Sequence, residues 1–133
     1  MPIIEGSQQR GVAKFSYDFA AQGGAAGDIT LVGTPLPIKA VVWDGVVDVI
    51  TPLTGGAGAT AAVSTSQSAN DLITAADITG APWSTAGSKA IVPVGTAAAS
   101  IKMTAARAPK LVVATNDLTA GKFNLFIEYY LSD

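Results

Sequence analysis

The chain contains serines and carboxylates but few groups that could activate them. Nucleophilic catalysis needs a base beside the nucleophile, and the sequence has no His and no Cys. Ser88 and Lys89 are neighbours, but adjacent residues of a strand point to opposite faces and cannot pair with each other. No GxSxG motif is present. We therefore predict that the chain is not an enzyme of the Ser or Cys hydrolase type.

Two carboxylates, Asp44 and Asp48, are four residues apart in an extended stretch and would share one face. They suggest a cation site or an acid pair, but such spacing is more often the solvated face of a strand, and no third ligand is evident. Zinc sites need Cys or His. Glycosidase-type pairs could also be drawn from a wider set of acids, as in any β protein: Asp18, Asp28, Asp44, Asp48 and Glu128. We predict no catalytic residue, no metal and no cofactor.

Other ligand classes find little support. Gly23, Gly24 and Gly27 superficially resemble a phosphate-binding loop, but their spacing fits no known fingerprint. The formal net charge of −2 does not favour nucleic acid or an acidic membrane. No apolar run approaches the roughly 20 residues of a membrane helix. Between residues 78 and 116 the chain has cations and no acid, which indicates a solvated face or, alternatively, a binding patch: Lys89, Lys102, Arg107 and Lys110.

The clearest element is residues 118–131, where large apolar side chains alternate with polar ones at the period of a strand. Within this stretch, residues 119–122 are expected to form a turn, and the strand is expected to follow it from Phe123. Further strands are predicted at residues 12–19, 28–33, 38–50, 59–66, 90–95, 100–107 and 110–115. Gly45 indicates a bulge or a bend within 38–50. The small side chains of 59–66 would allow a second chain to approach closely.

These strands predict an all-β protein, a jelly-roll-like antiparallel β-sandwich of about eight strands with at most one short helix. The helical signal is at residues 70–78. Residues 1–11 are expected to form an extended N-terminal arm and residues 12–133 the sandwich domain. Trp83, in a loop, is either a plug over the core or an interface anchor. The predicted core consists of Phe15, Tyr17, Val47, Val49, Val112, Leu125 and Ile127.

The second half of the chain contains three motifs in a recognisable order: VPVGT at 92–96, IKMTAAR at 101–107 and LTAGKFNLFIEYY at 118–130. With LPIKAVVWDGVVDVITPL upstream, residues 36–131 resemble head structural proteins of tailed bacteriophages. Met103 departs from the Thr that is common there. The resemblance implies a capsid decoration (cement) protein, a jelly-roll sandwich that sits as a homotrimer on the outside of the head and stabilises the major capsid protein lattice. A tail or fibre β-sandwich module that binds a carbohydrate or another virion protein is the alternative.

The resemblance places the protein on the virion surface after folding in the host bacterial cytoplasm, where disulfides are not needed. Its partners would be the major capsid protein and further copies of itself. The arm and two loop cations are the candidates for capsid contact: Pro2, Ile3, Ile4, Arg10, Lys89 and Arg107. The small-residue strand and the loop Trp are the candidates for trimer contact: Ala59, Ala61, Val63 and Trp83.

Overall fold

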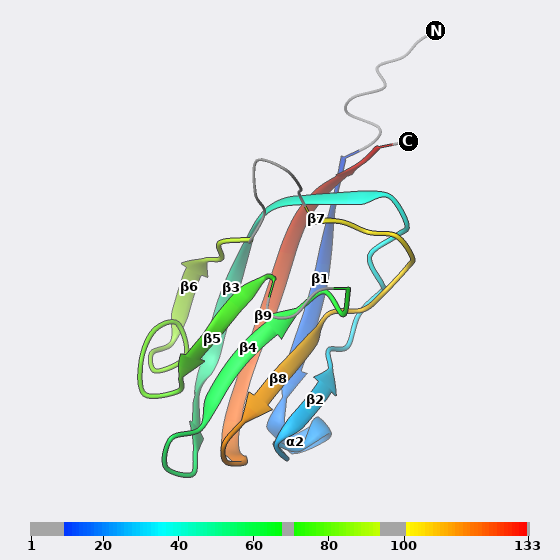
Figure 1. The fold of residues 1–133 in the computed structure, drawn as a ribbon. Helices are drawn as coiled ribbons and strands as arrows, with labels where there is room; N and C mark the ends of the chain where they lie inside the picture. Colours follow the sequence, from blue (N-terminus) through cyan, green and yellow to red (C-terminus); the bar gives the residue numbers. More distant parts are fainter. Residues whose placement is uncertain (1–9, 68–70, 94–100, 133) are drawn as a thin grey trace, which may run out of the picture.

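A computed structural model describes residues 10–67, 71–93 and 101–132. These residues form nine strands and one short helix, arranged in two layers (Figure 1). The elements are β1 (Arg10–Asp18), α2 (Phe19–Gln22), β2 (Gly27–Thr30), β3 (Ala40–Gly55), β4 (Thr60–Ser64), β5 (Ile73–Asp77), β6 (Gly87–Ala90), β7 (Ile101–Lys102), β8 (Lys110–Ala114) and β9 (Leu118–Leu131).

The strand order is that of a jelly roll. One sheet has the order β1-β9-β3-β6, with the short β7 also paired to β3, and the other has the order β2-β8-β4-β5. The antiparallel pairs are nested: β1 with β9, β2 with β8, β3 with β6 and β4 with β5. A long antiparallel ribbon rolled in this way buries one face of each sheet against the other. The predicted fold class is therefore confirmed.

The inner faces of β1 and β9 hold large side chains that lie directly opposite each other. Phe15 pairs with Leu125, and Tyr17 pairs with Phe123. All four are fully buried. The rings of Tyr17 and Phe123 have centroids 5.5 Å apart in a tilted arrangement. Cross-strand aromatic pairs of this kind stabilise a sheet beyond the area that they bury.

The predicted core is confirmed at every residue except Val112, for which the prediction is wrong. Val112 is half-buried, whereas its neighbours Leu111 and Val113 are in the core. Successive side chains of a strand alternate between faces, so β8 can bury only one of these two sets. Val112 lies opposite Asp28 of β2, on the outer face.

A bulge is present in β3, but it lies two residues before the predicted Gly45. The register with β9 shifts between Val42 and Asp44, so Trp43 is the extra residue. The shift inverts the alternation of inward-facing and outward-facing side chains along β3, and Trp43 is 45% exposed. Gly45 has a different role: a Cβ there would lie 2.5 Å from the Phe126 carbonyl oxygen and 2.7 Å from Ile91 Cδ1.

Two local predictions are wrong. Residues 73–77, within the predicted helix, form strand β5 and pair with β4, because the neighbouring strand supplies both backbone partners and an apolar surface. Residues 119–122, the predicted turn, lie inside β9, and the turn is at 115–117. The described helix is α2, whose N-terminus is capped by the Asp18 side chain, which accepts a hydrogen bond of 3.0 Å from the Ala20 N–H.

Within the described residues, the first strand of the sandwich starts at Arg10, two residues before the predicted domain start. Arg10 pairs with Tyr130 and Gly11 with Tyr129, so the start of β1 and the end of β9 lie at the same end of the sandwich (Figure 1). None of the helices in the described ranges has the length and apolar character needed to cross a membrane.

Candidate functional site

Three of the five carboxylates considered for chemistry have structural partners instead. Asp28 forms an ion pair of 2.7 Å with Lys110. Asp44 accepts a hydrogen bond of 2.8 Å from the Gly45 N–H, and Asp18 caps α2. Within the described residues, no group of three or more acids is close enough to hold a metal ion.

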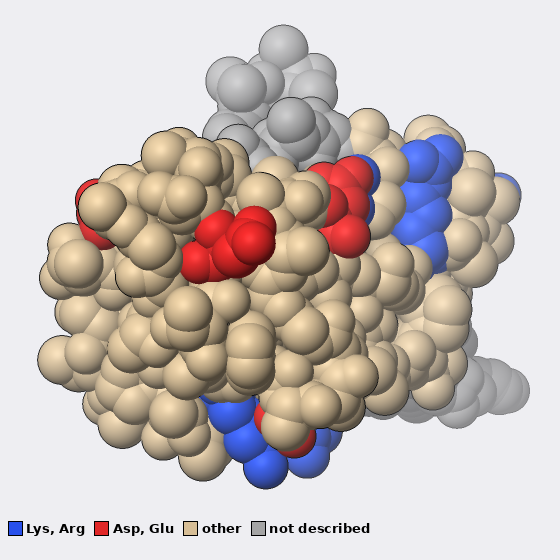
Figure 2. All heavy atoms as spheres, turned by 90° about the horizontal axis from the view of Figure 1, so that it is seen from below, with Lys and Arg blue, Asp and Glu red and all other residues tan. Residues whose placement is uncertain are grey.

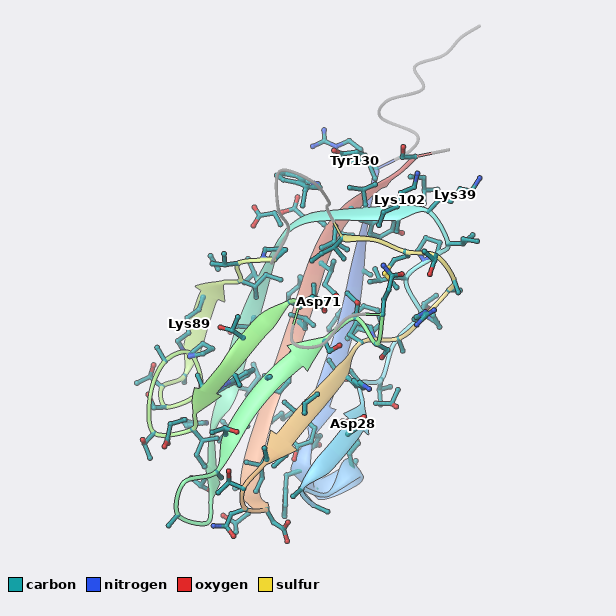
Figure 3. All side chains as sticks on the ribbon, viewed as in Figure 1. Asp28, Lys39, Asp71, Lys89, Lys102 and Tyr130 are labelled. Carbon is teal, nitrogen blue, oxygen red and sulfur yellow. The ribbon has the colours of Figure 1, made fainter. Side chains whose placement is uncertain are left out.

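The cations of residues 78–116 do not form one patch. Lys89 and Lys102 lie far apart on the molecule (Figure 3). Arg107 donates a hydrogen bond of 2.9 Å to the Ser66 carbonyl oxygen, and Lys110 is paired with Asp28. Lys89 donates to the carbonyl oxygen of Thr85. The arrangement is that of separate solvated cations rather than of a binding patch.

The four residues predicted to contact other copies do not lie on a surface. Ala59, Ala61, Val63 and Trp83 are all 0% exposed and belong to the core. Trp83 donates from Nε1 to the Ala61 carbonyl oxygen at 3.1 Å, and its ring lies 5.3 Å from that of Phe123. Trp83 is therefore a core plug, and any contact between copies must use other residues. The indole is thereby bonded to the backbone of β4, the strand of small residues.

The capsid-contact candidates are placed only in part. Pro2, Ile3 and Ile4 lie outside the described residues. Arg10 is exposed at the start of β1, whereas Arg107 and Lys89 are partly buried and already donate hydrogen bonds to nearby carbonyl groups.

Three loops meet at the end of the sandwich opposite the start of β1, and we call this surface the loop end. It comprises residues 23–27, 56–59 and 115–117. Asn116 Nδ2 donates to the Ala57 carbonyl oxygen at 2.5 Å, and the Gly56 N–H donates to that of Asp117 at 3.0 Å. The Ala26 N–H donates to the Asp117 carboxylate at 2.8 Å. These bonds join the three loops into one preorganised surface.

The loop end carries little charge. Seen from below, this end of the molecule is mostly uncharged, with a few separate acidic and basic groups (Figure 2). A shallow hollow of about 430 Å³ lies beside it, lined by residues such as Gly55, Ala57 and Thr79. The Asp77 carboxylate accepts hydrogen bonds from the backbone N–H and from the hydroxyl of Thr79. These two bonds, the backbone one most strongly, lower the pKa of the Asp77 carboxyl. A rigid, weakly charged surface of small residues is suited to close contact with a large partner.

A groove lies between β6, at the edge of one sheet, and β5, at the edge of the other. Its volume is about 410 Å³. Val47, Ile73 and Ile91 form its buried floor, and Lys89 and Val92 are at its rim. We call it the β5–β6 groove. Its lining is mostly apolar, with Thr74 and Lys89 as the polar side chains. Figure 3 shows that Lys89 projects from β6 beside the loop before it.

A third hollow, of about 390 Å³, lies near the start of β1. It is lined by Arg10, Val12, Trp43, Glu128 and Tyr129, among others. An exposed indole beside a carboxylate and a phenol is a combination found in carbohydrate sites. The bulge that exposes Trp43 could not be located from local periodicity, so sequence reasoning missed this hollow.

The fold has known structural counterparts. A chain of the "Cyanophage Pam1 capsid asymmetric unit" aligns with a TM-score of 0.65 and 21% identity, covering 99% of this chain and 100% of that one. A chain of the "Capsid of Ralstonia phage GP4" has a TM-score of 0.62 and 20% identity, with coverage of 100% and 90%. A chain of the "Acidic stable capsid structure of Helicobacter pylori bacteriophage KHP30" has a TM-score of 0.60 and 16% identity, with coverage of 93% and 89%.

No protein-family model and no curated protein matches the chain. At these identities the structural likeness establishes a shared fold over essentially the whole sandwich.

Proposed function

We propose that this protein is a bacteriophage capsid decoration protein, a homotrimer that binds the outside of the head and stabilises the lattice of the major capsid protein. The observation that carries the proposal is the whole-chain likeness to chains in three phage capsid structures. The motifs at residues 92–96, 101–107 and 118–130 point independently to head structural proteins. A rigid β-sandwich in which Asp18, Asp28 and Asp44 serve structural roles fits a structural function better than a catalytic one.

We place the capsid contact at the loop end. Its loops are already joined by hydrogen bonds, so little conformational entropy is lost on binding. Its small side chains allow a partner backbone to approach closely. Trimeric binding would add the contributions of three such surfaces, which makes a firm attachment possible from individually weak contacts.

The test introduces a charge at the loop end and measures binding to heads that lack the protein. Ala57 is exposed in the β3–β4 loop, and we expect Ala57→Lys to reduce co-sedimentation with such heads at least tenfold. Ala106→Lys, at an exposed alanine of the β7–β8 loop, is the matched control and should bind normally. Equal binding by both variants would show that the capsid contact is not at the loop end. If the unaltered protein and both variants all fail to bind heads, the decoration function is refuted.

The arm predicted from the sequence is the other candidate for capsid contact, through Pro2, Ile3, Ile4 and Arg10. Because Arg10 and Gly11 belong to β1, the truncated chain should start at Arg10 rather than at Val12. If that chain folds and still binds heads with unchanged affinity, the arm is not the capsid anchor. A loss of head binding with an intact loop end would assign attachment to the arm.

A tail or fibre module that binds carbohydrate is the second candidate, and the hollow beside Trp43 is the observation that favours it. An exposed indole can stack on a sugar ring while Glu128 accepts hydrogen bonds from its hydroxyl groups. A glycan array should then give a hit that Trp43→Ala abolishes. The absence of any hit, together with localisation of the protein in purified heads, would exclude this candidate.

A further inference from the structure

We propose that the β5–β6 groove is the docking site for the N-terminal segment, residues 1–9, of a second copy of this chain. The segment would add as an antiparallel strand to the free edge of β6. The contact is between copies and does not require capsid attachment.

The edge of β6 is open to such a strand. Within the described residues, β6 pairs only with β3. Ile91 donates to the Gly45 carbonyl oxygen at 3.1 Å, and the register continues to Lys89 opposite Val47. Hydrogen-bonded pairs alternate along an antiparallel ladder, so the backbone groups of Ser88 and Ala90 point away from β3. They are therefore available to an added strand.

The side chains of the groove match the segment residue by residue. Lys89 lies opposite the inward-facing Val47, so Lys89 and Ile91 face the space between the sheets. In the segment MPIIEGSQQ, Ile3 and Glu5 are two residues apart and would share one face of a strand. An antiparallel register with Ile3 opposite Ile91 places Glu5 opposite Lys89. A parallel strand would instead set the carboxylate against the isoleucine.

The same register fits the backbone. It places Ile4 opposite Ala90 and Gly6 opposite Ser88, the two β6 residues with outward hydrogen-bonding groups. Pro2, which has no N–H, falls beyond the end of β6. Lys89 discourages strands that lack a matching acid, since an inward-pointing charge is a common protection of sheet edges. The groove would therefore select strands that carry both an aliphatic side chain and a carboxylate.

The segment must come from another copy because its own chain cannot reach. Arg10 pairs with Tyr130, which pairs with Val41, whereas Ser88 pairs with Asp48. These two levels are about 23 Å apart along β3, and β1 and β6 lie three strand spacings, about 14 Å, apart across the sheet. The four residue steps from Arg10 to Gly6 span at most about 14 Å. A segment that joins each copy to the next forms a closed ring if the rotation closes, as a trimer does.

The first test uses a disulfide, since the chain has no cysteine of its own. Hydrogen-bonded antiparallel pairs have Cα atoms about 5.5 Å apart, a distance that a disulfide spans. The double variant Ile4→Cys with Ala90→Cys should give covalent oligomers on a non-reducing denaturing gel after mild oxidation. The control pairs Ile4→Cys with Val32→Cys, at a residue that is 60% exposed on another part of the molecule. It should give only background cross-linking.

The second test exchanges the charges. Glu5→Lys and Lys89→Glu should each raise the protein concentration at which half of the chains are associated at least tenfold, as measured by sedimentation velocity. The double variant should restore the original value. A full-length protein that is monomeric at all concentrations would overturn the proposal. The proposal would also be overturned if a chain starting at Arg10 assembled like the full-length protein and the test pair of cysteines gave no more cross-linking than the control pair. Because both experiments use purified protein without heads, their outcome is independent of the capsid-binding test.

Discussion

At the residue scale, the core depends on a few large side chains from segments far apart in the sequence. Tyr17, Trp83 and Phe123 come from β1, the β5–β6 loop and β9, and all three are fully buried. The phenol of Tyr17 donates to the Gly23 carbonyl oxygen at 2.6 Å, and the indole of Trp83 donates to that of Ala61. Each polar group in this aromatic cluster is therefore satisfied, as buried groups must be.

Leu125→Ala should destabilise the protein by about 2–5 kcal/mol, because it leaves a cavity between fully buried neighbours. The measurement is the free energy of unfolding from chemical denaturation. Val112→Ala is the control, since Val112 is half-buried on the outer face. The two variants should differ clearly, and equal losses would contradict the assignment of faces to β8 and β9.

Alkaline pH should weaken the fold through Tyr17. Burial, with a contribution from the Asp18 charge, raises the pKa of Tyr17 from 10.0 to about 12. As pH rises above 10 the unfolded chain loses this proton first, so stability that is complete below pH 10 is lost up to about pH 12. The free energy of unfolding should fall by about 1.4 kcal/mol per pH unit for this one group.

Tyr17→Phe supplies the comparison for that prediction. It removes the titrating group and the hydrogen bond to Gly23, so the variant should be less stable at neutral pH but less sensitive between pH 10 and 12. Parallel pH profiles for the two proteins, measured by denaturant titration, would assign the alkaline loss to other groups.

At the element scale, β3 is the central strand of its sheet because it pairs with β9, β6 and β7. Its bulge at Trp43 changes which side chains face the core, so that Val42 before it and Val47 after it are both buried. The same bulge exposes Trp43 and creates the hollow near the start of β1. One extra residue in one strand thus determines both core packing and surface chemistry.

Gly45→Ala should destabilise the protein by about 1–3 kcal/mol, because the new methyl group would meet the Phe126 carbonyl oxygen of the paired strand. Gly80→Ala is the matched control, since a Cβ there has only the Asp77 carbonyl oxygen near it, at 3.5 Å. Thermal unfolding followed by circular dichroism measures both. A midpoint for Gly45→Ala equal to that of the control would contradict the close approach of the Phe126 carbonyl oxygen to Gly45.

At the scale of the whole molecule, the two proposed contacts lie on different parts of the sandwich. The loop end contains the joined loops, and the β5–β6 groove lies at the edge strands of the two sheets. Association between copies and attachment to a capsid can therefore occur together. The low charge of the loop end also distinguishes the two contacts by their response to salt (Figure 2).

Head binding through the loop end should change less than about threefold between low and high salt, because few charges contribute to it. Association between copies should weaken more, since the contact proposed for it sets Glu5 against Lys89. Sedimentation at several ionic strengths measures both. Head binding that falls steeply with salt would indicate a charged contact instead of the loop end.

The sequence by itself determined the fold class and much of the core, since the two-residue period of Phe15 with Tyr17 and of Leu125 with Ile127 is a local property of each strand. The lack of His and Cys also restricted the chemistry. Tertiary structure decided the features that depend on a distant partner. Residues 73–77 are a strand because β4 lies beside them, and Trp83 is buried because β4 and Phe123 enclose it. The β5–β6 groove exists only because two sheets end side by side, a contact that no local pattern encodes.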